Sequence, residues 1–421
     1  MTYLDHTHDT SAKSWVESAQ GSDFPIQNLP WGVCSNNGIV VGIGDSAIVL
    51  RKAIAQEVVG FSAEISDALQ QDNLNLFMAL GSEVWTKVRH GLFEMLSGKA
   101  APDILCPMTE LQLILPASIG DYTDFYAARN HATNVGKMFR PDGDPLLPNY
   151  LHLPVGYHGR ASSIVVSGTE IMRPKGQLKP DEGDPVFAPC RLLDYELEFG
   201  AFIGSGNKMG NRITMDNAMS HIFGVVILND WSARDVQKWE YQPLGPFNAK
   251  NFASTISPWI VTIDALAPFR RHGPARQEND PPLLDYLKPV TEDVLDVQCS
   301  VAIASKAMRN DSTKPIQLSS GSLTELSWSF AQMLVHHTST GCPMQSGDLI
   351  GSGTISGSEK RSRGCLLELA WRGTEPIDLP DGTHRKFLQD GDELTMSAWC
   401  ESSDAIRIGF GSCSGIILPA G

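Results

Sequence analysis

The sequence predicts a mostly β protein with some α-helix, built from a small N-terminal domain and a larger β-rich domain. Short apolar or alternating runs recur along the chain, and turn residues separate them, with 26 prolines and 38 glycines among 421 residues. Helical patterns are few and do not alternate regularly with the strands, which disfavours a doubly wound α/β sheet. A chain of this length has room for about two or three domains.

The first domain, residues 23–117, follows a polar segment over residues 1–22 that we expect to form a mobile arm. Turn signals that contain glycine flank two short apolar runs, 39–43 and 47–50, which predicts a hairpin. Apolar residues at spacings of three or four predict a helix over 83–96.

The second domain, residues 118–421, is richer in strand patterns. We predict strands over 162–166, 194–203, 222–228, 259–263, 297–304, 348–351, 366–371, 393–398 and 406–417. Helical patterns are limited to 123–134, 232–241 and 324–336. The second domain is therefore expected to be β-rich.

Composition excludes several classes of protein. The net charge is 33 − 48 = −15, which argues against a nucleic-acid binder and against docking on an anionic membrane. No apolar stretch approaches the roughly 18 residues of a membrane span, and the N-terminus resembles neither a signal nor a transit peptide. Eight scattered cysteines form no Cys-x-x-Cys pair, which is typical of buried thiols in a reducing compartment. We expect a soluble, cytoplasmic protein.

The segment 193–199 alternates strictly between apolar and acidic residues. On a strand, Asp194, Glu196 and Glu198 would share one face. Burial of neighbouring carboxylates is costly unless a cation compensates, and a hard ion such as Mg²⁺ or Ca²⁺ would suit oxygen ligands. The alternative is an edge strand with a solvated acidic face.

Asp230 follows the apolar run 222–228, at the expected end of a buried strand, where ligands often bind. In the helical pattern after it, Arg234, Gln237 and Tyr241 stand at i, i+3 and i+7 and would share one face. That face would offer a guanidinium, an amide and a phenol. An exposed amphipathic helix is the alternative.

A third group of polar residues begins at Asp121. Thr123 could cap a helix that brings Asp124, His131 and Arg140 close together. Histidine titrates near neutral pH and is the usual general base, although a structural histidine is the alternative.

Five motifs carry weaker signals. Gly411–Gly415 fits a nucleophile elbow around Cys413, but the chain ends before the helix that an elbow needs, so a terminal strand is favoured. Gly351–Gly357 lacks the P-loop lysine and indicates a tight loop. His6–His8 and His336–His337 lack metal-ligand context; we expect disorder for the first and packing for the second. Arg270–His272 is expected to be a solvated turn.

Six segments taken together closely resemble the fumarylacetoacetate hydrolase family. They are 121–126, 131–139, 151–163, 193–198, 229–235 and 353–357, and the resemblance runs from Asp23 to the C-terminus. It implies an N-terminal SH3-like β-barrel, a C-terminal mixed β-sandwich roll and a homodimer. It also implies hydrolysis of the carbon–carbon bond of 4-fumarylacetoacetate to fumarate and acetoacetate, the last step of tyrosine and phenylalanine catabolism.

The same resemblance assigns site residues. It implies that the metal ligands around Mg²⁺ or Ca²⁺ are Asp124, Glu196, Glu198 and Asp230, with Lys250 and Ser254 beside them. It implies a general base with its orienting carboxylate, His131 and Glu368, and oxyanion-stabilising groups, Arg234, Gln237 and Lys250. The implied contacts to a diketo-dicarboxylate substrate are Tyr126, Arg140, Tyr157, Gln237, Tyr241 and Thr354. One departure is Ala253-Ser254, where the family usually has Gly-Thr, although serine keeps the hydroxyl.

These residue types suit the implied chemistry. Cleavage of a carbon–carbon bond beside a ketone leaves an enolate, which a divalent cation can stabilise. A carboxylate-held histidine can deprotonate water, and fixed cations can stabilise the alkoxide that follows. The rival hypotheses are a related metal-dependent acylpyruvase or β-diketone hydrolase, a non-catalytic metal-stabilised binding protein, and a hydrolase that uses Cys413.

Overall fold

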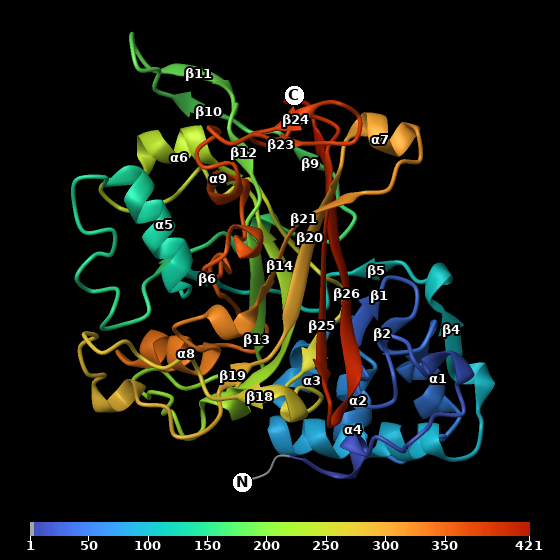
Figure 1. Ribbon diagram of the computed structural model, residues 1–421. Coiled ribbons are helices and arrows are strands. Elements are labelled where there is room, and N and C mark those ends of the chain that lie inside the picture. Colours follow the sequence, from blue (N-terminus) through green and yellow to red (C-terminus); the bar gives the residue numbers. More distant parts are fainter. Residues whose placement is uncertain (1–3) are drawn as a thin grey trace.

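The computed structural model describes residues 4–421, and its N-terminal part is a five-stranded antiparallel sheet with helices around it (Figure 1). The sheet order is β4-β3-β2-β1-β5, with β1 (Trp31–Cys34), β2 (Gly38–Ile43), β3 (Ser46–Val49), β4 (Leu105–Pro107) and β5 (Leu113–Ile114). The helices are α1 (Leu50–Ala55), α2 (Ala63–Leu69), α3 (Asn75–Ala79) and α4 (Ser82–Ser97). The predicted hairpin and the predicted helix over 83–96 are confirmed.

The predicted arm, residues 1–22, is described from residue 4 onward, and this part packs against the N-terminal domain; residues 1–3 lie outside the described residues. Arg89 of α4 is buried, and its Nε donates to Thr7 Oγ1 at 2.9 Å. Its Nη1 donates to the backbone oxygen of Asn28 at 2.9 Å. A buried guanidinium requires acceptors, and the N-terminal segment supplies one of them.

Two sheets build the second domain. The larger has eight strands: β6 (Tyr122–Phe125), β7 (Gly156–His158), β8 (Ile164–Val166), β13 (Leu197–Ile203), β14 (Ile222–Asp230), β16 (Ser254–Ile256), β17 (Val261–Thr262) and β22 (Leu349–Gly351). Its order is β7-β6-β22-β13-β14-β16-β8, and β17 pairs with β14. The second sheet has the order β21-β20-β25-β26-β9, with β9 (Ile171–Met172), β20 (Gln298–Ala304), β21 (Ile316–Ser322), β25 (Glu393–Ser402) and β26 (Ala405–Leu418).

Short strand pairs and helices surround the two sheets. The pairs are β10 (Lys175–Leu178) with β11 (Val186–Pro189), β12 (Leu193–Asp194) with β15 (Ser232–Ala233), β18 (Arg270–Arg271) with β19 (Val294–Leu295), and β23 (Ile377–Asp378) with β24 (His384–Arg385). The helices are α5 (Arg129–Phe139), α6 (Arg234–Glu240), α7 (Lys306–Asn310), α8 (Phe330–Thr338) and α9 (Leu366–Leu369). In Figure 1, α5, α6 and α9 lie on the same side of the large sheet, above β6.

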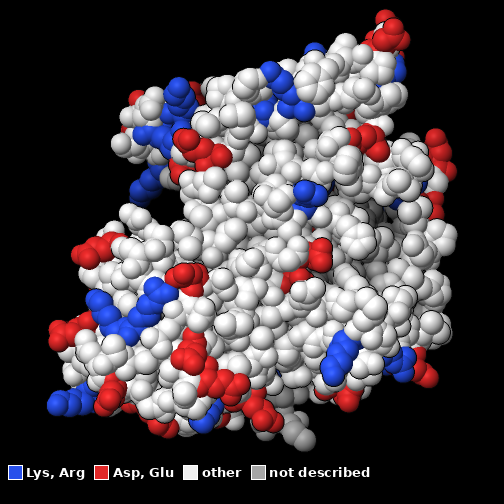
Figure 2. Space-filling view, turned by 180° about the vertical axis from the view of Figure 1, so that it is seen from behind, with Lys and Arg blue, Asp and Glu red and all other residues white. Residues whose placement is uncertain are grey.

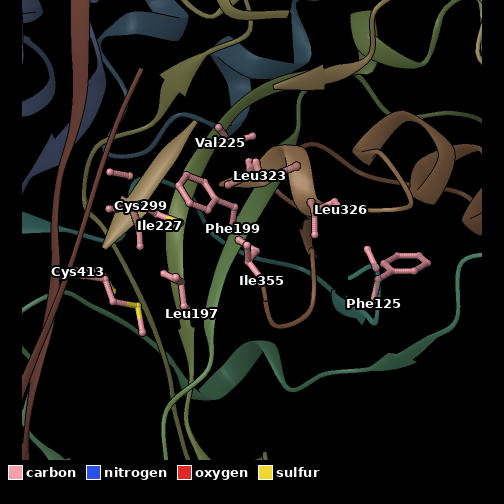
Figure 3. Packing of buried hydrophobic residues seen from close by; sticks show 14 of the residues in the cluster. Phe125, Leu197, Phe199, Val225, Ile227, Cys299, Leu323, Leu326, Ile355 and Cys413 are labelled. Carbon is pink, nitrogen blue, oxygen red and sulfur yellow. The ribbon is translucent and has the colours of Figure 1, made fainter. Parts of the chain in front are cut away.

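The large sheet is buried on both faces. On one face, Phe199 and Ile227 pack with Cys299 and Cys413 of the second sheet (Figure 3). On the other, Phe223 of β14 belongs to a cluster shared with the N-terminal domain. Its ring lies 6.1 Å from Trp31, 5.8 Å from Phe77 and 5.2 Å from Trp85, measured between centroids. Because β14 is buried on both faces, its sequence is an almost continuous run of apolar residues.

The overall prediction of a mostly β fold, with an N-terminal β domain and a larger β-sheet domain, is confirmed. The predicted strands over 222–228, 297–304, 393–398 and 406–417 are present as β14, β20, β25 and β26. Cys413 lies inside β26, in agreement with the terminal strand that we favoured over an elbow.

Three local predictions are wrong. The segment predicted as one helix over 123–134 is strand β6 followed by helix α5. The segment 366–371, predicted as a strand, contains α9. Arg270, expected in a solvated turn, is buried, and its Nε donates to the backbone oxygen of Glu292 at 2.9 Å.

The charged side chains on the face seen in Figure 2 are of both signs and are interspersed, and the middle of that face is largely uncharged. In the part of the chain from residue 4 onward, no helix has the length and apolarity needed to cross a membrane.

Candidate active site

One cavity of about 390 Å³ brings most of the predicted site residues together. It opens beside the ends of β6 and β13, and α5 and α6 contribute to its walls. The predicted residues that line it are Asp124, Tyr126, His131, Arg140, Tyr157, Glu196, Glu198, Arg234, Gln237, Tyr241, Lys250 and Thr354. The other three are buried: Asp230 bonds to Lys250 and Glu368 bonds to His131, both of which line the cavity, and Ser254 bonds to Asp230.

Three carboxylates form a tight cluster at one end of the cavity. Asp124, Glu198 and Asp230 each place an oxygen within 4.8 Å of the other two, and all three are buried. They come from β6, β13 and β14, three strands of one sheet. Gly351 of β22, between β6 and β13, leaves the space that Asp124 fills, since a Cβ there would lie 2.5 Å from Asp124 Oδ1.

This cluster holds more negative charge than its surroundings neutralise. Within residues 4–421, neither oxygen of Glu198 accepts a hydrogen bond from a backbone or side-chain donor. Burial, with Asp124 and Asp230 nearby, raises the pKa of Glu198 well above its usual value. Burial and Asp230 likewise raise the pKa of Asp124 to about 7. An all-oxygen set of this kind fits a hard divalent cation.

Lys250 and Ser254 donate hydrogen bonds to the Asp230 carboxylate of this cluster. The Lys250 ammonium donates to Glu196 Oε2 and, at 2.7 Å, to Asp230 Oδ2, and Ser254 Oγ donates to Asp230 Oδ1 at 2.7 Å. An ammonium has no lone pair for a metal, so Lys250 is not a metal ligand, and its hydrogen bonds position and neutralise the carboxylates. Ser254, which stands where the family usually has threonine, therefore uses its hydroxyl to bind Asp230.

The alternating acidic residues, Asp194, Glu196 and Glu198, do not lie on one continuous strand. The strand is interrupted between β12 and β13, and Arg234 binds the first two of its three acids: Nε donates to Asp194 at 2.9 Å and Nη1 to Glu196 Oε1 at 2.6 Å. Only Glu198 joins the three-carboxylate cluster. All three acids are buried, so the alternative of a solvated edge strand is wrong.

Asp194 has a role that the sequence did not reveal. Its two oxygens accept the backbone N–H groups of Leu366 at 2.8 Å and Leu367 at 3.0 Å, which are the first residues of α9. Asp194 thus caps the helix that carries Glu368 while it also holds Arg234. The alternating pattern drew attention to this residue but gave no sign of its partners.

His131, which lines the cavity, and Glu368 form a buried pair. His131 Nδ1 lies 2.6 Å from Glu368 Oε2. Three further side chains that sequence reasoning missed donate to this carboxylate: Asn134 at 2.8 Å, Ser356 at 2.8 Å and Cys365 at 3.2 Å. Asn134 stands three residues after His131 on α5, whereas Ser356 is far in sequence from both residues of the pair and Cys365 carries no recognisable motif.

Replacement of Glu368 by glutamine tests this network through its pH dependence. Burial would raise the pKa of Glu368, but His131, Asn134 and Ser356 outweigh burial and lower it to about 2. A lowered pKa stabilises the fold above the unfolded-state value and loses that effect as the pH falls toward 2. Glu368→Gln should therefore cost about 3 kcal/mol at neutral pH, and less as the pH falls below about 4.5.

The measurement is chemical denaturation of both proteins at a series of pH values. Glu375→Gln, at an exposed ion pair with Lys360, is the matched control and should give a small difference throughout. A Glu368→Gln difference that does not change with pH would contradict the assigned ionisation.

The predicted substrate contacts fall into two groups. Tyr126 packs edge-on against His131, with centroids 5.1 Å apart, and Tyr157 donates to Asp230 Oδ2 at 3.0 Å, so both already brace site residues. Arg140, at the end of α5, has a buried Nε without a hydrogen-bond partner within the described residues. Tyr241 and Thr354, also predicted substrate contacts, line the cavity as well. Four apolar side chains line it too: Val135, Phe139, Leu147 and Leu244.

Comparison with known proteins gives consistent matches over nearly the whole chain. The family model "Fumarylacetoacetase N-terminal" matches residues 27–116, and "Fumarylacetoacetate (FAA) hydrolase C-terminal" matches residues 121–416. The fumarylacetoacetases of Dictyostelium discoideum and Homo sapiens are 47% and 46% identical over 97% of this chain, and over 98% and 99% of their own lengths. A solved structure, fumarylacetoacetate hydrolase from Exiguobacterium antarcticum, has a TM-score of 0.52 at 17% identity, covers 93% of this chain and 99% of that one, and shows the same fold.

Proposed function

This chain belongs to the fumarylacetoacetate hydrolase family, and from that premise we infer how its residues carry out the family's reaction. It is a hydrolase that cleaves a carbon–carbon bond of fumarylacetoacetate, giving fumarate and acetoacetate. The observation that carries the residue assignment is one cavity with a carboxylate-held imidazole at one wall and a buried three-carboxylate cluster at another.

We propose that Asp124, Glu198 and Asp230 hold a divalent cation, with Glu196 as a fourth ligand. Glu196 and Asp230 share the Lys250 ammonium, which places the two carboxylates on either side of one donor. When bound, the cation supplies a Lewis acid for the oxygens of the diketone. The oxygen-only ligand set suits Mg²⁺ or Ca²⁺, and these are the ions we propose.

His131 is the proposed general base. The ionised Glu368 can only accept a hydrogen bond, so it holds the proton of His131 on Nδ1 and leaves Nε2 with a free lone pair. That nitrogen can take a proton from a water molecule as the water attacks the substrate carbonyl. The ring packs against Tyr126, which limits its rotation.

Arg234, Gln237 and Lys250 are the proposed donors to the oxyanion. Burial would lower the pKa of Lys250, but Asp230 and Glu196 raise it above the usual value, so the residue stays cationic and cannot be the base. Arg234 and Gln237 contact each other at 3.3 Å on one face of α6. Donors fixed before the reaction stabilise developing charge without reorganisation.

Arg140 and the cavity-lining tyrosines Tyr126, Tyr157 and Tyr241 are proposed to bind the carboxylate ends of a diketo-dicarboxylate. A homodimeric state, a cytoplasmic location and a place at the end of tyrosine and phenylalanine breakdown are further proposals, and the family resemblance supports them.

The test follows the ultraviolet absorbance of fumarylacetoacetate with purified protein, with and without a chelator. We expect rapid loss of absorbance that the chelator abolishes and that added Mg²⁺ or Ca²⁺ restores, because the carboxylate cluster then regains its cation. Inactivation by a thiol reagent but not by the chelator would favour a cysteine hydrolase instead. No turnover by folded, metal-replete protein would contradict the named substrate and favour another diketone or a binding role.

A further inference from the structure

The His6–His8 motif, expected to be disordered, is built into a small polar cluster on the N-terminal domain. Asp5 caps the short 3₁₀ turn, and its Oδ1 accepts the backbone N–H of Thr7 at 2.8 Å. The two ring nitrogens of His8 are both in use, with the Asp5 backbone N–H at 3.1 Å and the backbone oxygen of Asp264 at 2.8 Å. The turn is therefore held in a defined position.

Three metal-ligating side chains converge beside this turn. Asp5, His6 and His90 of α4 each place a ligand atom within 4.8 Å of the other two. Asp5 Oδ2 lies 2.7 Å from His90 Nε2, and the rings of His6 and His90 are 4.5 Å apart between centroids. None of the three lines the catalytic cavity. We propose that they form a second metal site, which binds a divalent transition metal such as Zn²⁺.

The donor set distinguishes this site from the carboxylate cluster. Two imidazoles with one carboxylate suit Zn²⁺ and its neighbours, whereas Mg²⁺ and Ca²⁺ prefer oxygen ligands. The metal replaces the hydrogen shared between Asp5 and His90, and water completes its coordination because His6 is exposed.

The surrounding contacts fix the ligands before a metal binds. Arg89 precedes His90 in α4 and donates to Thr7, which stands between His6 and His8. The N-terminal segment and α4 are thus joined by a buried hydrogen bond between residues that are adjacent in sequence to His6 and His90. Such preorganisation lowers the entropy cost of binding. Bound metal would join the same two elements through three ligands in place of the Asp5–His90 hydrogen bond.

The experiment is a calorimetric titration of the full-length enzyme with Zn²⁺ in excess Mg²⁺, which keeps the catalytic cluster occupied. His6→Ala and His90→Gln are the test variants, since glutamine can still donate a hydrogen bond to Asp5 but is a poor zinc ligand. His272→Ala is the matched control, because that side chain is 79% exposed and lies outside the cluster. We expect Zn²⁺ affinity to fall at least about 100-fold in the two test variants and to be unchanged in the control.

A thermal melt gives an independent readout. Zn²⁺ should raise the melting temperature of the wild type and of His272→Ala but not of the two test variants, because only a native-state site stabilises the fold. Activity with Mg²⁺ should be the same in all four proteins. Equal Zn²⁺ binding in all four, or the absence of any Zn²⁺ binding, overturns the proposal. Binding lost in Glu198→Gln and kept in His6→Ala also overturns it, since the ion then occupies the catalytic cluster.

Discussion

Replacement of His131 by alanine is expected to lower kcat by about 10²- to 10⁴-fold while the fold and the metal affinity are retained. The reason is that Glu368 holds His131 through Nδ1, so Nε2 is the one nitrogen that can take a proton from water in the cavity. Removal of the ring leaves the three-carboxylate cluster and the oxyanion donors in place. The decrease should therefore appear in kcat, with KM little changed.

His336→Ala is the matched control. That ring bonds to the Tyr286 hydroxyl at 3.0 Å, away from the cavity, so its loss should leave turnover intact. Circular dichroism and a metal titration of His131→Ala establish that fold and cation binding survive. Full activity in folded His131→Ala would remove this residue from its assigned role.

Replacement of Glu198 by glutamine is expected to have the second large effect, on metal affinity and on activity together. Glu198 is buried, and in the described chain no donor bonds to either oxygen, so its ionised form would need the proposed cation as a partner. Affinity for Mg²⁺ or Ca²⁺ should fall at least about 100-fold, since even residues that only orient ligands contribute 10- to 100-fold.

The same variant should not be destabilised in the presence of a chelator. The pKa of Glu198 is raised by burial and by Asp124, so the metal-free wild type favours the protonated acid, which glutamine imitates. Thermal melts with and without cation check both statements, and Glu375→Gln serves as the exposed control. A variant much less stable than the wild type without metal would contradict the charge assignment.

The spacing of apolar residues predicted the secondary structure correctly where residues close in sequence determine it. The helix over 83–96 has one apolar face and was predicted almost to its ends, and the run that ends at Asp230 is a strand buried on both sides. Pattern failed at 366–371, because α9 is capped by Asp194, a residue far away in the chain. It also failed at Thr123, whose strand β6 exists through parallel pairing with β22.

The chemistry of the site was predictable mainly through the family resemblance. Residue types alone suggested that Asp194, Glu196 and Glu198 would act together, yet Arg234 binds the first two and only Glu198 belongs to the three-carboxylate cluster. Asp124 of the cluster comes from another strand, and no spacing rule reveals that pairing. Ser356, which bonds to Glu368, lies in a glycine-rich loop whose sequence suggested only a tight turn.

The aromatic contact at Phe223 also changes how the two domains should be understood. The two family models divide the chain after residue 116, yet the core does not divide there, because Phe223 of β14 packs with Trp31, Phe77 and Trp85 and the strand ends at Asp230. A substitution that disturbs the packing of the N-terminal domain on β14 can therefore shift Asp230, because Phe223 and Asp230 both lie on that one strand. We therefore expect substitutions at Trp31, Phe77 or Trp85 to lower activity, although none of these residues lines the cavity.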